Sequence, residues 1–288
     1  MTPSDVQATG IRQHIAALLR GERRPSPAAP VRLADSTLAT LRGARTTQID
    51  GVSVFEIRRD FEELLPGEDA WRALRDGMGH LATKEEEEIY AGLRPAIGAD
   101  PARVAILDLE TTGFWGCPIF LVGLLRVENG RLVTRQLLAR DYPEEAAVLR
   151  AAAALLDESA LVITFNGKSY DVPCFAERCS MFGVKTKLRR RPHVDILHVA
   201  RRRWRGEFED CRLQTLERHV TRLTRQGDIP SAEIPAVYHD FAATGDVSRL
   251  EPILHHGRVD VITTLRLFTA LAADPPAPLR PRKRKVVS

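Results

Sequence analysis

Cysteines and long apolar runs are scarce in this 288-residue sequence, and their scarcity excludes several classes of protein. Four cysteines without a Cys-x-x-Cys pair are too few for a disulfide-stabilised scaffold and do not match a zinc-knuckle pattern. The most apolar stretch, residues 146–165, is interrupted by Arg150, Asp157 and Glu158, whereas a membrane span needs about 18 apolar residues. The first twenty residues lack the apolar segment of a secretory signal. We therefore expect a cytoplasmic protein that neither spans a membrane nor is secreted.

The net charge is only +4, but the basic residues are unevenly distributed. Residues 185–225 contain thirteen Lys and Arg against five acidic residues, and residues 280–285 contain five more basic residues. Such clusters suit a polyanion, because neutralising phosphates releases condensed counterions. A solvated charged face in an arginine-rich protein is an equally simple explanation. Charge therefore suggests nucleic acid as a partner without establishing it.

Secondary-structure signals are weak in the first third of the chain and strong after residue 100. The early signals are a helical spacing at Asp5–Leu19, a proline-rich linker at 25–30 and a strand-like alternation at Ser53–Arg58. The signals in the first third of the chain do not indicate a function. We expect an N-terminal, partly flexible region at 1–100, a domain at 101–273 and a basic disordered tail at 274–288.

The order of the later elements predicts an α/β fold. Val104–Leu107 and Leu161–Phe165 are apolar runs typical of buried strands. Residues 119–138 contain two further strands, joined by a hairpin turn at Asn129-Gly130. Helices are expected at 143–156, 171–182 and 248–272. Three strands followed by helix, strand and helix resemble the ribonuclease H-like layout, a three-layer core with a mixed central sheet flanked by helices.

Four acidic residues are candidates for a functional site, because they follow two of the expected strands or lie in the last expected helix. Asp108 and Glu110 follow the first strand, and residues i and i+2 of an extended chain point to the same side. Asp171 follows the strand Leu161–Phe165 after a short turn, and Asp260 lies in the apolar last helix. A cap or a salt bridge explains each acid alone, and Asp171 suits a helix N-cap. Together they fit an oxygen-rich cluster for magnesium or manganese, because crowded carboxylates repel one another unless a cation lies between them.

The segments around these acids resemble the three exonuclease motifs of the DnaQ-like (DEDD) 3′–5′ exonuclease superfamily, and most closely its YprB-type ribonuclease H-like branch. The motifs are DLETTG at 108–113, NGKSYD at 166–171 and HHGRVD at 255–260. Residues 198–202, 210–213 and 228–230 strengthen the assignment to this branch. The resemblance covers residues 103–272, and the first hundred residues match only loosely.

The resemblance implies a catalytic centre with two Mg²⁺ or Mn²⁺ ions. Asp108 would bridge the ions, Glu110 and Asp260 would complete one metal site, and Asp171 would hold the second ion. Two such ions would clamp the scissile phosphate and stabilise both the attacking and the leaving oxygen.

Other residues near the motifs are candidates for substrate contacts. Phe114 is a candidate stacking group, with ordinary packing as the alternative for it and for Trp115. The run 201–205 combines arginines with Trp204, as expected where a single strand is tracked, although an amphipathic helix with Trp204 inside also explains it. The full set of substrate-binding candidates is Thr111, Thr112, Phe114, Asn166, Lys168, Arg201, Arg202 and Trp204.

The general base has two candidates, His255 and His256. Members of the superfamily carry either a His five residues before the last Asp or a Tyr four residues before it, and this chain has a His at both positions. On a continuous helix His256 lies nearly in line with Asp260, whereas His255 is turned about 140° away. Gly257 could break the helix and let His255 approach. We favour His255, because the active-site His of such enzymes commonly precedes the helix.

Three further polar residues have simpler explanations. Asp195 resembles an acid that follows the second motif in relatives, but a helix cap explains it equally well. His193 and His198 are expected to pack or lie on the surface rather than bind metal.

The leading hypothesis is a metal-dependent nuclease that degrades single-stranded nucleic acid from its 3′ end and releases nucleoside monophosphates. One alternative is a catalytically inactive nucleic-acid-binding or adaptor protein on a nuclease fold. A structure-selective endonuclease is the second alternative. The sequence does not distinguish DNA from RNA, because no motif reports contacts to the 2′-hydroxyl.

Overall fold

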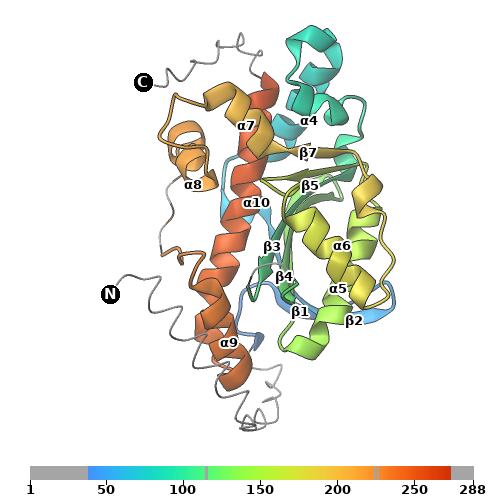
Figure 1. Cartoon of the computed structure of the whole chain (residues 1–288), viewed down its shortest axis with the longest axis vertical. Coiled ribbons are helices and arrows are strands. Elements are labelled where there is room, and N and C mark those ends of the chain that lie inside the picture. The colour runs from blue at the N-terminus through green and yellow to red at the C-terminus, as the bar shows by residue number, and fades with distance from the viewer. Residues whose placement is uncertain (1–37, 114–115, 224, 226, 274–288) are drawn as a thin grey trace, which may run out of the picture.

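A computed structural model describes residues 38–113, 116–223, 225 and 227–273 of the chain. The expectations for Asp5–Leu19, the linker at 25–30 and the tail at 274–288 lie outside the described residues. Within those residues, seven strands form one sheet in the order β1-β2-β5-β4-β3-β6-β7 (Figure 1). The strands are β1 (Ala44–Ile49), β2 (Val52–Asp60), β3 (Val104–Thr111), β4 (Ile119–Glu128), β5 (Arg131–Leu138), β6 (Leu161–Thr164) and β7 (His193–Asp195).

The sheet is mixed, because its two halves pair differently. Neighbours from β1 to β3 are antiparallel, whereas β3, β6 and β7 are parallel. The turn between β4 and β5 has positive φ at Asn129 (51°) and Gly130 (74°), which confirms the predicted hairpin. β2 pairs with β5, so the described part of the first hundred residues extends the same sheet.

Helices cover both faces of this sheet (Figure 1). α10 packs on β3, β4 and β5 from one side, while α5 packs on β2, β4 and β5 and α6 on β3. The helices are α3 (Phe61–Leu64), α4 (Ala70–Thr83), α5 (Glu145–Asp157), α6 (Asp171–Met181), α7 (Ile196–Trp204), α8 (Leu213–Leu216), α9 (Ile234–Thr244) and α10 (Leu250–Ala273). Short 3₁₀ turns lie at 86–88, 91–96, 101–103, 142–144, 188–190 and 247–249, and a π-helical turn at 217–221. This arrangement confirms the predicted α/β fold with a mixed central sheet flanked by helices.

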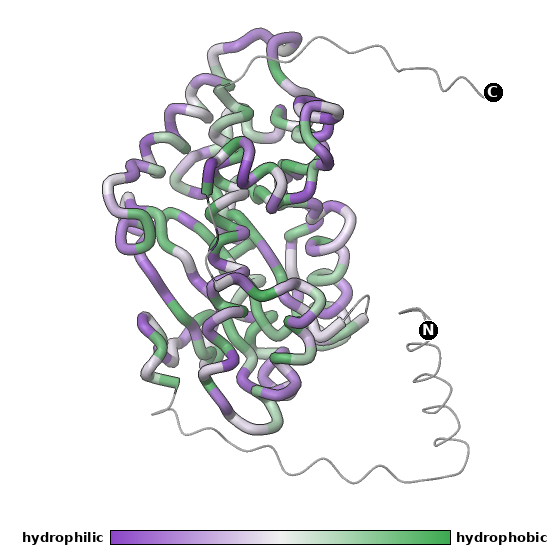
Figure 2. The backbone as a smooth tube through the Cα atoms, turned by 90° about the vertical axis from the view of Figure 1, so that its left-hand side faces the viewer, coloured by the Kyte–Doolittle hydropathy of each residue, from purple (hydrophilic) through white to green (hydrophobic). Residues whose placement is uncertain are grey.

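Hydrophobic segments lie mainly in the interior of this arrangement, and hydrophilic segments mainly outside it (Figure 2). None of the helices in the described part of the chain is long and apolar enough to cross a membrane.

The alternation of side chains along β3 determines which of them reach α10. Val104 and Ile106 belong to the hydrophobic cluster that includes the buried face of α10, and the intervening residues belong to the cluster beneath α5 and α6. Because successive strand residues point to opposite faces, Asp108 and Glu110 continue toward α10. β3 runs beyond the predicted end, because it pairs with β4 as far as Thr111, with an irregularity after Glu110.

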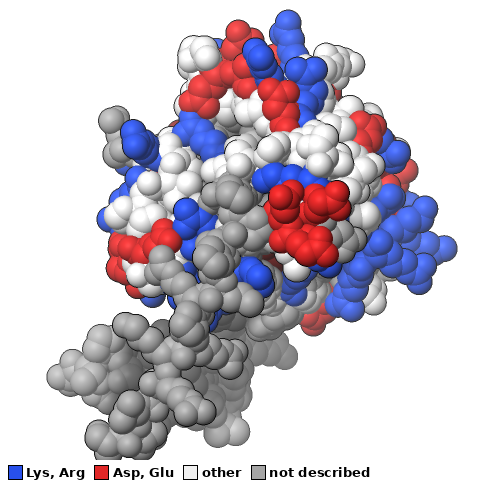
Figure 3. Space-filling model, turned by 90° about the horizontal axis from the view of Figure 1, so that it is seen from above, with Lys and Arg blue, Asp and Glu red and all other residues white. Residues whose placement is uncertain are grey.

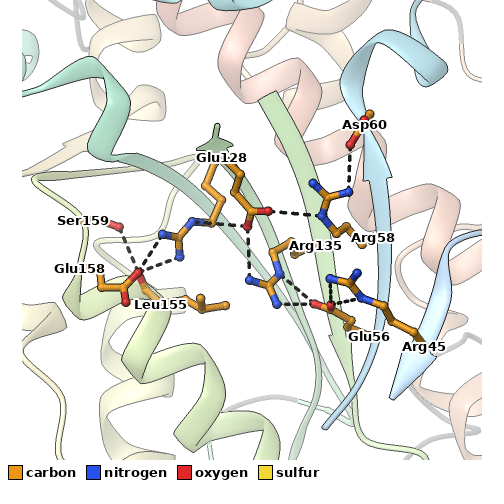
Figure 4. A network of polar contacts seen from close by, with 10 residues as sticks. Arg45, Glu56, Arg58, Asp60, Glu128, Arg135, Leu155, Glu158 and Ser159 are labelled. Carbon is orange, nitrogen blue, oxygen red and sulfur yellow. Dashed lines mark hydrogen bonds and ion pairs between the residues drawn. The ribbon is translucent and has the colours of Figure 1, made fainter. Parts of the chain in front are cut away.

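A network of charged side chains around the buried Glu56 links β1, β2, β4 and β5 (Figure 4). Glu56 is fully buried and lies 2.6 Å from Nη2 of Arg135 and 2.6 Å from a guanidinium nitrogen of Arg45. Arg135 also pairs with Glu128 at 3.3 Å. The carboxylate of Glu56 is therefore compensated only as long as these arginines remain.

Replacing Arg135 with alanine is expected to lower the free energy of unfolding by about 3 kcal/mol, because Glu56 keeps its burial and loses a close partner. Urea denaturation followed by circular dichroism measures the change. Arg42→Ala is the control, because its pair with Glu63 is exposed (72% and 44% for the two side chains) and should contribute less than about 1 kcal/mol. Equal effects of both substitutions would contradict the assignment of Arg135 as a buried stabilising partner.

Candidate active site

The four predicted acids come from three elements that meet near the carboxyl end of β3. Asp108 and Glu110 lie in β3, Asp171 is the first residue of α6 and Asp260 lies in the middle of α10. Leu109 of β3 donates its backbone N–H to Oδ1 of Asp171 at 3.1 Å, which fixes the start of α6 beside the strand. The structure thus brings together residues that lie up to 152 positions apart in the sequence.

The loop before α6 is held by Asp195. Its carboxylate accepts the backbone N–H groups of Asn166 (2.9 Å), Lys168 (3.0 Å) and Leu197 (3.1 Å). It therefore caps α7 and at the same time shapes the turn that leads to Asp171. Asn166 has a φ of 66°, a left-handed conformation that asparagine tolerates better than most residues. The helix-cap explanation of Asp195 agrees with these contacts.

α10 approaches the sheet closely beside the acids. Gln136 of β5 donates to the backbone carbonyl of Leu254 at 2.8 Å, and a Cβ built on Gly123 would lie 3.8 Å from the carbonyl oxygen of Gly257. α10 is continuous from Leu250 to Ala273, so the helix break considered at Gly257 is absent. The continuous helix holds the side chains at positions 256 and 260 on the same face.

The crowded carboxyl groups hold protons more tightly than free ones. Burial raises the pKa of Asp108 and of Glu110 well above their ordinary values, and the charge of Asp260 raises both further. Burial raises the pKa of Asp171 to about 7, despite the N–H donors that favour its charged form. The pKa of Asp260 is also raised by burial, against the opposing effect of Arg225. Four negative charges at this place are therefore unfavourable without added positive charge.

The carboxyl groups as a set fit a hard divalent cation. Their donors are oxygens, and Glu110 and Asp260 keep 14% and 17% of their side chains exposed, so solutes can reach them. As the side chains stand, no three acidic, histidine or cysteine groups of the described residues converge enough to hold a metal ion. Instead, Nη2 of Arg225 lies 2.5 Å from Oδ1 of Asp260. Metal binding here requires some of these side chains to rearrange.

Arg225 connects Asp260 to two further acids. Its guanidinium lies 2.8 Å from Glu217 and 3.1 Å from Asp228, and only 8% of its side chain is exposed. The hydroxyl of Thr263, on α10, donates to Glu217. Sequence reasoning noted residues 228–230 only as a family segment, and no local spacing predicts the partners of Arg225 or Glu217.

The two histidine candidates have different surroundings. Nε2 of His256 lies 3.7 Å from Asp260 and 4.0 Å from Glu110, and its Nδ1 lies 2.8 Å from Asp228. Nε2 of His255 is buried without a hydrogen-bond partner among the described residues, and burial lowers the pKa of this imidazole. The structure therefore places His256, and not His255, between the acids.

Comparison with known proteins agrees with this fold. The family model of the RNase H superfamily matches residues 105–272, more than half of the chain. The chain belongs to the RNase H superfamily. It is also 31% identical over 179 residues to an uncharacterized protein, YprB, of Bacillus subtilis. That match covers 60% of this chain but only 43% of the Bacillus protein, so the chain spans less than half of that relative's length.

RNase H-like nucleases cleave nucleic acid and generally use divalent metals. The matched residues include all four acids and both histidines. The match also takes in the basic segment and the loop residues predicted to contact substrate.

The residues predicted to contact substrate have different environments in this RNase H-like structure. The hydroxyl of Thr111 lies 2.6 Å from the carbonyl oxygen of Gly113 and 2.8 Å from the hydroxyl of Tyr170, which holds the turn after Glu110. Thr112 donates its backbone N–H to Pro118 across the same turn. Phe114 and Trp115 lie outside the described residues.

The remaining candidates differ in their exposure. Asn166 and Lys168 are exposed on the loop before α6, and Arg201 and Arg202 are exposed on α7. Trp204 is only 6% exposed and packs in the hydrophobic core, as the amphipathic-helix alternative predicted. Its ring is therefore not available to stack on a base.

The structure divides the basic segment into parts with different environments. Arg212, Arg218 and Arg225 form ion pairs with nearby acids, which neutralises part of the surplus charge. The side chains at 185, 187, 189 and 190 are exposed and line a hollow of about 830 Å³ beside α6. His193 lies 2.8 Å from the hydroxyl of Thr164, and burial lowers its pKa to about 4, in agreement with a packing role.

Proposed function

We propose that this chain is a metal-dependent 3′–5′ exonuclease that hydrolyses phosphodiester bonds of single-stranded DNA or RNA with two Mg²⁺ or Mn²⁺ ions. The observation that carries the proposal is the group of four acids on the RNase H-like fold, two of which, Glu110 and Asp260, lie 4.0 Å and 3.7 Å from Nε2 of His256. The raised pKa values of the carboxyl groups support a site that gains from added positive charge.

Asp108, Glu110, Asp171 and Asp260 would hold the ions. Bound divalent ions stabilise charge on both the attacking and the leaving oxygen of a phosphodiester. The charges of Asp260, Glu110 and Asp171 raise the pKa of Asp108, which supports a role for this residue in holding the ions. Asp171 is oriented toward this site by the N–H of Leu109.

His256 takes the role of general base in this proposal. A base must lie within reach of the water that attacks the phosphate, and Nε2 of His256 lies 4.0 Å from Glu110 and 3.7 Å from Asp260. His255, the residue favoured by the motif pattern, occupies a different environment on the uninterrupted helix. We therefore assign the base to His256.

Substrate binding would use the turn after Glu110 and the exposed loop before α6. Thr111 and Thr112 stiffen the turn, and Asn166 and Lys168 are accessible to a terminal nucleotide and its phosphate. Seen from above, Lys and Arg side chains gather on one side of the molecule (Figure 3). Such a surface would attract the backbone of a single strand.

Degradation of 5′-labelled single-stranded DNA and RNA tests the proposal. We expect a ladder that shortens from the 3′ end in Mg²⁺ or Mn²⁺, no products in EDTA, and none from the Asp108→Asn variant. A closed circular single strand should resist, because it offers no 3′ end.

Two other results would replace the proposal. Cleavage of the circle would indicate an endonuclease on the same acids. Equal binding of the strands with and without Mg²⁺, with no cleavage under any condition, would indicate a binding or adaptor protein.

A further inference from the structure

A carboxylate from the segment before α9 contacts the side of His256 that faces away from the acids. Asp228 lies beside Nδ1 of the imidazole, and Arg225 lies beside Asp228. We propose that Asp228 is a positioning residue that keeps the proton of His256 on Nδ1 and leaves Nε2 free to accept a proton at the active site. This inference deepens the proposed function and rests on it, since His256 is the base only if the chain is a nuclease.

The contacts of Asp228 make it a hydrogen-bond acceptor. Oδ1 lies 2.8 Å from Nδ1 of His256, and Oδ2 receives Nη1 of Arg225 at 3.1 Å. Arginine has only donors, so the carboxylate accepts on that side, and an ionised carboxylate can only accept on the other side as well. The imidazole must therefore donate from Nδ1.

The opposite edge of the ring has one hydrogen-bond partner among the described residues, the hydroxyl of Ser231, which can donate to Nε2. Nε2 lies 3.7 Å from Asp260 and 4.0 Å from Glu110, beyond the usual range of a hydrogen bond, and 3.4 Å from the hydroxyl of Ser231, which can itself donate. The protonated nitrogen of a neutral His is set by the partner of the other nitrogen. Only 5% of the His256 side chain is exposed, so solvent has little effect on which ring nitrogen carries the proton.

Arg225 also determines what an asparagine at position 228 would do. The atom that faces the guanidinium would have to be the amide oxygen, because both groups would otherwise be donors. The amide nitrogen would then face Nδ1, which could only accept. The proton would move to Nε2, although the volume of the side chain would hardly change.

The test is the protonation state of His256 in protein labelled with ¹⁵N-histidine, read by long-range ¹H–¹⁵N NMR without metal at pH 8. We expect the Nδ1-protonated tautomer in the wild type and the Nε2-protonated tautomer in Asp228→Asn. In single-strand degradation, Asp228→Asn should lower kcat by about 100-fold to 1000-fold, while KM and the Mg²⁺ dissociation constant stay within about twofold. Asp240→Asn is the control, because Asp240 pairs with an arginine on the exposed surface.

Each result bears on a different part of the inference. An Nε2-protonated His256 in the wild type overturns the positioning role, whether or not the variant folds. An Asp228→Asn variant in which the proton has moved to Nε2 while kcat is unchanged also overturns the positioning role. If the wild type cuts no strand, the proposed function fails, while the spectrum of the metal-free protein still decides whether Asp228 sets the tautomer.

Discussion

Asp108→Asn is expected to abolish hydrolysis and, at the same time, to make the metal-free protein more stable. The activity should fall by about a thousandfold or more, because in the proposed mechanism the substitution removes a ligand that both ions would share. The thermal midpoint in EDTA at pH 8 should rise by several degrees, because the carboxylate is surrounded by Asp260, Glu110 and Asp171 and costs free energy in its charged form. Each kcal/mol corresponds to about 2–4 °C in a protein of this size.

Differential scanning calorimetry in EDTA and in Mg²⁺ measures the thermal midpoint of the wild type and of Asp108→Asn with and without metal. The wild type should gain stability on addition of Mg²⁺, since a ligand that binds the folded state stabilises it. Asp108→Asn should gain little. Asp76→Asn, on an exposed acid of α4, should leave activity, midpoint and the response to Mg²⁺ unchanged. A variant that is less stable than the wild type in EDTA would show that Asp108 has a structural partner instead of a repulsive environment.

The metal-free protein is also expected to lose stability as the pH rises from 6.5 to 8. The folded-state pKa of Asp171 is raised from 3.8 to about 7, so in this range the folded protein retains a proton that the unfolded chain has already released. Stability then decreases with increasing pH, by up to about 1.4 kcal/mol per pH unit for each such proton. Asp108 and Glu110 add to the effect, because burial also raises the pKa of each.

The carboxyl groups and His193 affect the stability of the protein over different pH ranges. The lowered pKa of His193, about 4, makes the protein more stable as the pH rises toward 6.5, and that contribution is complete above this value. Urea titrations at pH 6.5, 7.2 and 8 in EDTA measure the slope. Asp171→Asn should flatten it, and saturating Mg²⁺ should abolish or reverse it, because metal binding favours the deprotonated ligands. A slope of the opposite sign in EDTA would contradict the raised pKa values.

Local sequence patterns were sufficient to predict those structural features that neighbouring residues determine. The apolar run before Asp108 predicted a buried strand, and the spacing of Asp108 and Glu110 predicted that both would face one side. Asn129-Gly130 predicted its hairpin because few other pairs adopt positive φ at both positions. The acids themselves were found by residue type and order along the chain, and the structure places them together.

Long-range packing decided what these patterns left open. The motif pattern favoured His255 as the base, and our proposal of His256 rests on the continuity of α10, which contacts the sheet through Gln136. The exposure of Trp204 likewise depended on the core beneath α7.

By itself, the sequence predicted five of the seven strands, the helices α5, α6 and α10 and the four acids as site candidates, because periodicity and spacing act over a few residues. Only the tertiary structure decided that Arg225 and Asp228 lie against Asp260 and His256. Their segment lies between helices and has no periodicity of its own, so its partners depend on how α10 and the sheet are packed. Charge and hydrogen bonding between residues distant in sequence then determine the chemistry of the site.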